Sequence, residues 1–248
     1  MTVGAWKKWL HGSGLRCTES SKPLPPDTSL FLSQDSRELE TAQPGACGFV
    51  ALSGNWHNGH AFLEEAHKAG ARYFIVHASE SLPVLQDSDI VPCEDPVAAW
   101  QQLTRFWRDA CGTSVIAITG SNGKTTVKEW LLQLIAPRTV AFGSPRSYNS
   151  QVGVPLALGE LHPDHQWGIV EAGISQPGEM DRLENCIAPD VGVLTHLGEA
   201  HLEHFSDAAA LRAEKLRLFQ GCSWVAMPGY LNEAADDLRR QGSPVPTW

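Results

Sequence analysis

Short apolar runs alternate with segments of helical period in the first third of the chain. The runs GACGFVAL at 45–52 and RYFIVH at 72–77 have the length and apolar content of buried strands. Between them, GHAFLEEAHKAG at 59–70 carries apolar residues at helical spacing. A strand, a helix and a second strand in this order predict a βαβ unit.

A longer helix is predicted to follow. Asp95 is a good N-cap acceptor, Pro96 fits the first helical position, and apolar residues then recur at helical spacing: Val97, Trp100, Leu103, Trp107 and Ala110. Gly112 interrupts this pattern. Because a single domain usually has about 100–200 residues, we expect two domains in this chain, residues 1–111 and residues 112–248.

From residue 114 onward the pattern is that of a doubly wound sheet. The apolar run SVIAIT at 114–119 predicts a strand, and a helix that ends at Pro137 follows it. We assign four residues to the apolar face of this helix: Val127, Leu131, Leu134 and Ile135. Further strands are expected at 167–173, 191–197 and 223–229, with helices near 151–160, 178–186 and 207–220. The predicted fold class is α/β: a small N-terminal α/β domain, then a doubly wound parallel sheet with helices on both faces.

Composition and charge argue against several other classes of protein. A formal net charge of −9 disfavours a general nucleic-acid-binding surface, which needs a cationic excess. The six cysteines form no C-x-x-C pair, which indicates reduced thiols. No apolar signal segment and no run of about 18 apolar residues is present. We therefore expect a cytoplasmic monomer without nucleic-acid or membrane partners.

The segment ITGSNGKTT, which begins at Ile118, has the chemistry of a phosphate-binding loop. In the usual pattern, G-x-x-x-x-G-K-[ST], a glycine would replace Ile118. The remaining parts are present, since Gly120 and Gly123 allow close backbone approach, Lys124 supplies a cation and Thr125 a hydroxyl for Mg²⁺. The loop also lies between a predicted strand and a predicted helix. We therefore predict that a nucleotide binds to seven residues: Gly120, Ser121, Asn122, Gly123, Lys124, Thr125 and Thr126.

Five segments in the same order resemble one protein family. TGSNGKTT resembles the ATP-binding loop of the Mur ligases, which also lacks the first glycine of the usual pattern. Four further matches follow: SYNSQVGVPLAL at 147–158, EAGISQPGEM at 171–180, THLGEAHLEHF at 195–205 and EKLRLF at 214–219. The resemblance covers roughly residues 30–230, and it is strongest toward the family members that add D-alanyl-D-alanine, some of which are fused to an alanine racemase.

This resemblance implies an ATP-dependent ligase of peptidoglycan precursor synthesis, with ATP and Mg²⁺ as cofactors. A peptide carboxylate of UDP-MurNAc-tripeptide would attack the γ-phosphate of ATP to give an acyl phosphate and ADP. The amine of D-alanyl-D-alanine would then displace phosphate. Lys124 would stabilise charge on the transferring phosphoryl group. The implied partners are these small molecules and a fused or separate alanine racemase.

The resemblance also implies metal-binding residues in addition to Thr125. Glu171 ends a predicted strand, where doubly wound sheets bind ligands, although such a carboxylate can equally serve only to fix a loop. His201 matches a metal-contacting histidine of the family, whereas the nearby His204 is predicted to lie on the surface.

Lys215 lies on a predicted amphipathic helix, with Glu214 on the solvated side, and a helix-surface lysine is the default interpretation. In several Mur ligases the matching lysine reacts with CO₂, which converts a cation into a carboxylate-like metal ligand. The resemblance thus makes Lys124, His201 and Lys215 the expected catalytic residues.

Substrate-binding residues are expected in both domains. The segment that begins with DSR is similar to the UDP-sugar-binding domain of the family, and it places Ser36 and Arg37 at the UDP-sugar. An arginine fork and a hydroxyl suit a diphosphate or a uracil edge, but alone they form an ordinary turn with a surface ion pair. In the second domain, Asn149 and Ser150 would contact the substrate near its reacting carboxylate. A loop-capping role is the alternative for Asn149.

Two other functions stay open on the sequence alone. One is a different Mur-type or folylpolyglutamate-synthetase-like ligase, against which the DSR segment argues. The other is a non-catalytic nucleotide- or UDP-sugar-binding module. Mur ligases have a third domain, whereas this sequence stops at GSPVPTW before the central sheet should be finished. We therefore expect a truncated chain that lacks the C-terminal ligase domain.

Overall fold

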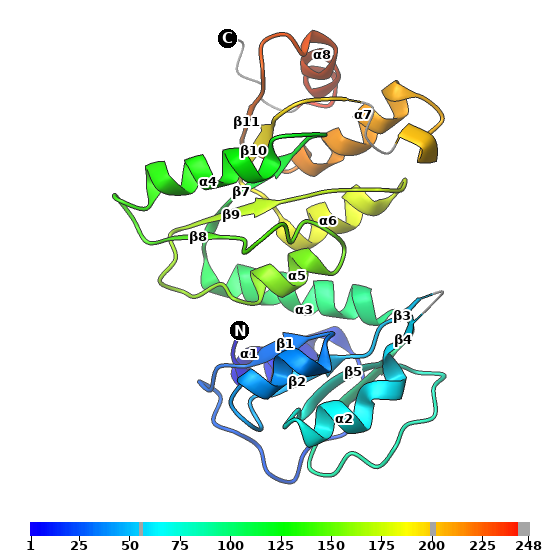
Figure 1. The fold of residues 1–248 in the computed structure, drawn as a ribbon. Helices are drawn as coiled ribbons and strands as arrows, with labels where there is room; N and C mark the ends of the chain where they lie inside the picture. Colours follow the sequence, from blue (N-terminus) through cyan, green and yellow to red (C-terminus); the bar gives the residue numbers. More distant parts are fainter. Residues whose placement is uncertain (55–56, 199–201, 243–248) are drawn as a thin grey trace. The chain divides into compact units, whose positions relative to one another are not determined.

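A computed structural model describes residues 1–54, 57–198 and 202–242. The chain divides into two compact units, Met1–Ala110 and Cys111–Trp248. Each unit contains its own parallel sheet (Figure 1). Strand pairing within the described part of both sheets is parallel throughout, which fits the predicted fold class.

The sheet of the first unit has the strand order β1-β2-β5-β6. Its strands are β1 (Phe31–Ser33), β2 (Cys47–Val50), β5 (Tyr73–His77) and β6 (Asp89–Cys93). The predicted βαβ unit is confirmed as β2, α2 (Leu63–Lys68) and β5, but the first helical turn is a 3₁₀ turn, η2 (Gly59–Phe62). Further elements are η1 (Ser36–Thr41), a short hairpin of β3 (Ser53–Gly54) and β4 (His57–Asn58), and α3 (Pro96–Cys111).

The two faces of this sheet are covered by different helices. Phe74 packs with Leu63 and Ala66 of α2 in one buried cluster. Tyr73, which directly precedes Phe74 in β5, points to the other face of the sheet. Its ring meets that of Trp6 in α1 (Val3–Ser13) edge-on, with the ring centroids 5.4 Å apart. The α1 helix was not predicted from the sequence, yet it has a Thr2 N-cap and an apolar face that includes the buried Trp6.

The predicted helix after residue 94 is confirmed as α3. The Asp95 carboxylate accepts the N–H of Ala98 at 3.0 Å, as an N-cap should. Trp100, Leu103 and Trp107 are buried, whereas Ala110 is exposed near the end of the helix. The tryptophans of this helix are therefore core residues.

The second unit contains a five-stranded sheet with the order β11-β10-β7-β9-β8. The strands are β7 (Ser114–Thr119), β8 (Ala141–Gly143), β9 (Trp167–Glu171), β10 (Val191–Leu194) and β11 (Trp224–Ala226). The α-helices are α4 (Lys124–Ile135), α5 (Gly153–Leu158), α6 (Glu179–Ile187), α7 (Ala208–Leu216) and α8 (Asn232–Arg240), and short 3₁₀ turns occur at η3 (Leu202–His204) and η4 (Arg217–Phe219).

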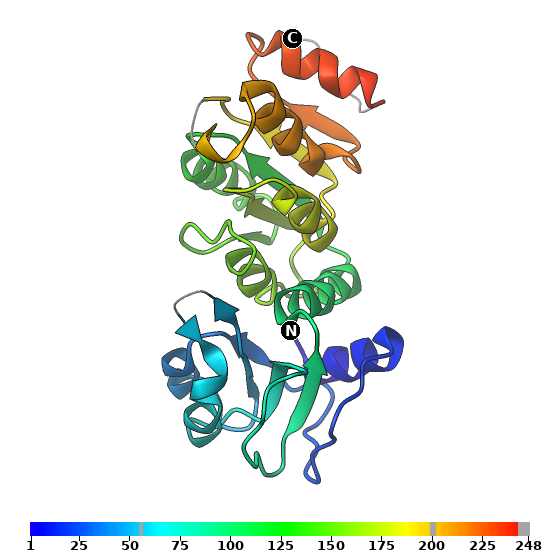
Figure 2. The same ribbon diagram turned by 90° about the vertical axis from the view of Figure 1, so that its right-hand side faces the viewer.

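Helices cover both faces of this sheet, as Figure 2 shows from the side. On one face, α4 packs over Ile116, Ile118 and Ile169. On the other face, η4 approaches β10 so closely that a Cβ added at Gly192 would lie 2.3 Å from the ring of Phe219. The doubly wound arrangement predicted for this part of the chain is confirmed.

Two details of the predicted helix faces are wrong. Leu134 is exposed, because the buried arc of α4 is centred on Lys128, Leu131 and Leu132 and leaves Leu134 at its edge. Glu214 is buried rather than solvated, because its carboxylate accepts the N–H of Met180 at the start of α6.

All six cysteines are free thiols, in agreement with the prediction. No helix in the described part of the chain combines the length and the apolar character needed to cross a membrane.

Candidate functional site

The phosphate-loop segment lies at the carboxyl end of β7, between this strand and α4. Gly120 has a φ of +143° and Gly123 a φ of +81°, which are conformations that favour glycine. A Cβ added at Gly120 would lie 2.1 Å from Oγ1 of Thr195, a residue that follows β10. The close approach of the loop to the end of β10 therefore requires glycine at position 120.

Polar contacts hold the loop against the residues after β10. The N–H of Ser121 donates to the carbonyl of His196 at 2.7 Å. The Ser121 hydroxyl accepts the N–H of Gly198 at 2.8 Å and lies 3.0 Å from the carbonyl of Gly198. Thr195 Oγ1 donates to the carbonyl of Asn122 at 2.6 Å. The loop is thus fixed by the adjacent strand end.

Lys124 is the cation of this loop. Its ammonium donates to the carbonyl of Gly120 at 2.7 Å. Burial lowers the pKa of Lys124, and the nearby negative charge of Glu171 acts in the opposite direction. Thr126, two residues further on, lies exposed in the first turn of α4.

Thr125 and Glu171 form a pair suited to a magnesium ion. Thr125 Oγ1 donates to Oε2 of Glu171 at 3.0 Å, and Glu171 is fully buried at the end of β9, the strand beside β7. The other carboxylate oxygen, Oε1, is buried and accepts no hydrogen bond. Among the described residues no group of three or more His, Cys, Asp and Glu side chains could enclose a metal. Mg²⁺ usually takes only one or two protein ligands, together with phosphates and water, so this hydroxyl–carboxylate pair fits it.

Lys215 is buried on α7 with only 3% of its surface exposed, contrary to the default interpretation. Burial, and secondarily the positive charge of Lys124, lower its pKa to about 8. Within the described ranges, no carboxylate lies within ion-pair distance of its ammonium. His201 lies outside the described residues, and His204 is on the surface, as predicted.

A cavity of about 350 Å³ joins four segments of the second unit. Gly120, Ser121 and Lys124 line one side, and Lys215 also faces this space. Asn149, Ser150, Gln151 and Val152 come from the segment before α5, and Gly173, Ile174, Ser175 and Glu179 come from the segment around the start of α6. Predicted nucleotide and substrate residues thus share one cavity.

The contacts of Asn149 and Ser150 explain their positions. The carbonyl of Asn149 accepts the N–H of Gly173 at 2.7 Å, which ties this segment to the chain after β9. A Cβ added at Gly173 would lie 3.1 Å from Asn149 Cγ, so the amide group lies directly against this glycine. The Ser150 hydroxyl accepts the N–H of Gly153 at 3.1 Å and so supports the start of α5.

Sequence reasoning did not single out Lys128, which is also a buried charge. Its side chain is 1% exposed and its ammonium lies 3.1 Å from Oε1 of Glu171. The sequence does contain a signal, because Lys128 falls between Val127 and Leu131 on the helix face that packs on the sheet.

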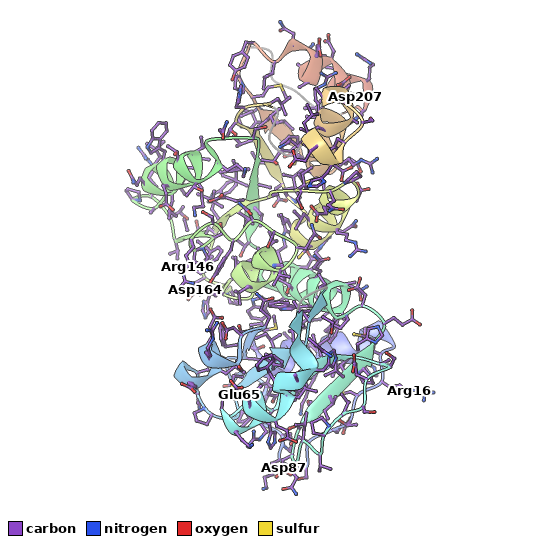
Figure 3. All side chains as sticks on the ribbon, turned by 45° about the vertical axis from the view of Figure 1, so that its right-hand side comes forward. Arg16, Glu65, Asp87, Arg146, Asp164 and Asp207 are labelled. Carbon is purple, nitrogen blue, oxygen red and sulfur yellow. The ribbon has the colours of Figure 1, made fainter. Side chains whose placement is uncertain are left out.

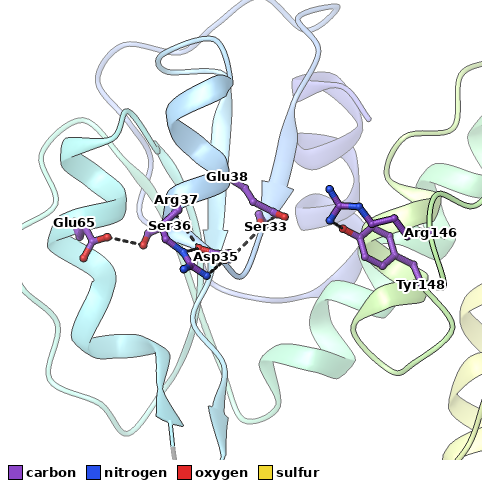
Figure 4. A network of polar contacts seen from close by, with 8 residues as sticks. All are labelled: Ser33, Asp35, Ser36, Arg37, Glu38, Glu65, Arg146 and Tyr148. Atoms are coloured by element: carbon purple, nitrogen blue, oxygen red, sulfur yellow. Dashed lines mark hydrogen bonds and ion pairs between the residues drawn. The ribbon is translucent and has the colours of Figure 1, made fainter.

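Ser36 and Arg37 line a separate cavity of about 430 Å³ in the first unit. Ser36 is buried and donates to Glu65 at 2.8 Å, while the exposed Arg37 makes a two-point ion pair with Asp35 at 2.8 and 2.6 Å (Figure 4). The aromatic side chains of Phe49 and Phe62 also line this cavity. The structure thus brings the two predicted residues to one cavity, each with a protein partner.

The parallel sheet, the glycine-containing loop at its edge and the contact between the exposed Thr125 and the buried Glu171 define a phosphate-loop α/β protein. Comparison with known proteins makes this more specific, because residues 118–238 match the family model of the Mur ligase middle domain. This segment, which makes up most of the second unit, is therefore a Mur ligase middle domain.

Relatives of known sequence and structure point to one branch of this family. UDP-N-acetylmuramoyl-tripeptide–D-alanyl-D-alanine ligase of Bacillus subtilis is 30% identical over 187 residues, which are 75% of this chain and 40% of that protein. A crystal structure of MurF from Acinetobacter baumannii covers 97% of this chain with a TM-score of 0.80 at 23% identity. The MurF ligase of Thermotoga maritima in complex with ADP covers 88% with a TM-score of 0.75 at 25% identity.

The chain is shorter than these relatives. It spans 40% of the Bacillus subtilis protein, 52% of the Acinetobacter baumannii chain and 50% of the Thermotoga maritima chain.

Proposed function

We propose that this protein takes part in the ATP-dependent addition of D-alanyl-D-alanine to UDP-MurNAc-tripeptide, a step of peptidoglycan precursor synthesis in the cytoplasm. The observation that carries the proposal is the cavity in which the phosphate loop, Asn149, Ser150 and Lys215 meet. The names of the relatives supply the substrates.

The residues of the loop would act on the phosphates of ATP. Backbone N–H groups at the start of α4 and the ammonium of Lys124 would bind and neutralise them, in a half-buried site where charge is screened less than in water. Thr125 and Glu171 would hold Mg²⁺, and the ion would neutralise phosphate charge and help to orient the γ-phosphoryl group.

Asn149, which lines the same cavity, would orient the substrate without reacting with it. An uncharged amide can hydrogen-bond one oxygen of the peptide carboxylate and leave the other free to attack the γ-phosphorus. The attack would form the C–O–P bond of an acyl phosphate and release ADP. The neutral amine of D-alanyl-D-alanine would then attack the acyl carbon, so that phosphate leaves as the amide forms and the amine loses a proton.

We also propose that Lys215 becomes a carbamate. Its neutral amine would attack CO₂, form an N–C bond and release one proton, which leaves a carboxylate-like group on the side chain. Burial of Lys215 and its closeness to Lys124 support this reaction, because the carbamate would replace repulsion between two ammonium groups with attraction. The resulting oxygens would be candidate Mg²⁺ ligands, with His201 as a further proposed ligand.

The first unit, extended to residue 111, is proposed to be the UDP-sugar-binding domain. In its cavity, Ser36 and Arg37 would bind the diphosphate, and Phe62 offers an aromatic face for uracil. Arg37 would exchange Asp35 for the ligand at little cost, since exposed ion pairs contribute little to stability.

The test is a ligation assay on the intact chain with Mg·ATP, UDP-MurNAc-tripeptide and D-alanyl-D-alanine, read as ADP and peptide product. The proposal predicts product that requires all three substrates and disappears in Lys124→Ala. ATP and UDP-sugar binding without product would identify a binding module instead. ADP formation with a folate and glutamate, but not with these substrates, would favour a ligase of the folylpolyglutamate type.

A further inference from the structure

Lys128 is a fully buried cation that touches three parts of the second unit. It lies on α4, one turn after Lys124, and is 1% exposed. Its ammonium donates to the carbonyls of Ser144 and Arg146, both at 2.7 Å. It also lies 3.1 Å from Oε1 of Glu171 and 3.2 Å from Glu129, whose side chain is half exposed. A lysine is seldom buried this completely without a specific role for its charge.

The two carbonyl contacts fix the start of the segment that leads to Asn149 and Ser150. Arg146 has a φ of +52°, in the left-handed region that non-glycine residues rarely adopt. The Lys128 ammonium holds the carbonyl of this unusual residue, while the Arg146 guanidinium donates to the Tyr148 hydroxyl at 2.9 Å (Figure 4). Ser144 is anchored on its other side, since its N–H donates to the carbonyl of Ile169 in β9. Lys128 therefore stabilises the backbone conformation that carries Asn149 to the cavity.

The third contact is electrostatic. Oε1 of Glu171 is buried and accepts no hydrogen bond, so the ammonium 3.1 Å away is the compensating charge for this carboxylate. Oε2 meanwhile accepts the hydroxyl of Thr125. One carboxylate oxygen thus faces Lys128 and the other faces the phosphate-loop helix, which determines the orientation that Glu171 presents to a metal.

We propose that Lys128 is a positioning residue that sets the substrate segment 144–150 and the carboxylate of Glu171 in one geometry around the phosphate loop. This inference rests on the proposed function only where it names ATP, Mg²⁺ and the peptide substrate as ligands. The contacts of Lys128 with Ser144, Arg146 and Glu171 are present in the protein without ligands. Arginine would not replace it, since a planar guanidinium cannot direct its donors to two carbonyls and a carboxylate arranged around a single nitrogen.

The test compares Lys128→Met with Ile135→Ala in the intact chain. Ile135 packs on the same sheet from the other end of α4, about 16 Å along the helix from Lys124, so its truncation lowers stability without touching the site. Glu129→Gln is a second control, which removes only the half-exposed neighbour of Lys128. If Lys128→Met does not fold, Lys128→Gln takes its place, since its amide can still donate to a carbonyl but carries no charge.

The first readout is hydrogen exchange of residues 144–151 without ligands, monitored by mass spectrometry. We expect at least about tenfold faster exchange in Lys128→Met than in Ile135→Ala, compared at equal distance from the melting temperature. The second readout is the ratio of the ATP dissociation constants measured without and with Mg²⁺. This ratio should fall toward one in Lys128→Met and stay unchanged in both controls.

The outcomes separate the two proposals. If the unsubstituted protein binds no ATP, the proposed function fails, and faster exchange in 144–151 still establishes the positioning role in the free protein. If exchange in this segment is the same in Lys128→Met and Ile135→Ala, Lys128 is only a packing residue and the inference is overturned. Equal Mg²⁺ factors in all variants would remove the part of the inference that concerns Glu171.

Discussion

The fold of the phosphate loop requires a residue without a side chain at position 120. The loop approaches Thr195 so closely that a Cβ at Gly120 would lie 2.1 Å from its hydroxyl oxygen and 2.9 Å from the carbonyl of His196. The φ of +143° excludes other residues independently of that contact. The backbone geometry of the protein itself therefore requires glycine at position 120.

We predict that Gly120→Ala destabilises the second unit by about 2–4 kcal/mol and weakens ATP binding at least about tenfold. Gly168→Ala in β9 is the matched control, because its added Cβ would meet its neighbours at an ordinary 3.5 Å. Urea denaturation and calorimetric titration with ATP measure the two effects. Equal stability and affinity in the two variants would mean that the loop geometry described here is incorrect.

The chemistry proposed for Lys215 can be observed directly. An amine with a pKa of about 8 is about one-tenth neutral near pH 7, whereas an ordinary lysine is neutral in only about one molecule in 3,000. We predict a carbamate ¹³C resonance after addition of ¹³C-bicarbonate, stronger near pH 8.5 than near pH 7 because the neutral fraction rises. The resonance should be absent from Lys215→Arg. A spectrum that is the same with and without Lys215 would contradict the assignment.

At the scale of the elements, the buried carboxylate of Glu214 on α7 connects this helix to α6. The carboxylate of Glu214 accepts the N–H of Met180 in the first turn of α6 at 3.0 Å and lies 3.4 Å from Arg217. A negative charge at the start of a helix also interacts favourably with the helix dipole. Asp207 caps α7 itself, at the position labelled in Figure 3. Glu214 therefore links the helix that carries Lys215 to the helix beside the cavity.

We predict that Glu214→Ala lowers the free energy of unfolding by about 1–3 kcal/mol, because the buried N–H of Met180 loses its acceptor. Glu214→Gln should lose less, since its amide oxygen can still accept. Glu233→Ala, on the largely exposed face of α8, should change stability by less than about 0.5 kcal/mol. Chemical denaturation followed by circular dichroism distinguishes these values, and a Glu214→Ala result equal to that of Glu233→Ala would refute the explanation.

The elements around the phosphate loop could be predicted because local patterns determine them. An apolar run, two glycines with a lysine and threonine at fixed spacing, and a helical period follow each other directly. The same reasoning placed Glu214 in solvent and did not single out Lys128, because helical periodicity assigns charged residues to the surface. Their partners, Met180 and the carbonyls of Ser144 and Arg146, are far away in sequence or are backbone atoms, which leave no local signal.

At the scale of the whole molecule, the two units contain separate cavities with different cations. The cavity of the first unit contains Arg37, and that of the second contains Lys124 and Lys215. Because each cavity is lined within one unit, substitutions in one should leave the intrinsic affinity of the other unchanged. This separation is consistent with the proposal that the first unit binds the UDP-sugar and the second unit binds ATP.

We predict that Arg37→Ala weakens binding of UDP-MurNAc-tripeptide at least about tenfold and leaves ATP affinity unchanged. Arg16→Ala, an exposed arginine of the same unit labelled in Figure 3, should change neither affinity. Calorimetric titrations of each ligand separately provide the measurement. If Arg37→Ala binds the UDP-sugar as well as Arg16→Ala does, the UDP-sugar site lies elsewhere.

The most direct test of the central claim is a calorimetric titration of ATP, with Mg²⁺ present, into the intact chain and into Lys124→Ala. We predict one saturable site with a Kd below about 1 mM and an affinity at least about tenfold lower in Lys124→Ala. No binding at millimolar ATP, or equal binding by both proteins, would contradict the assignment of the loop as the phosphate site.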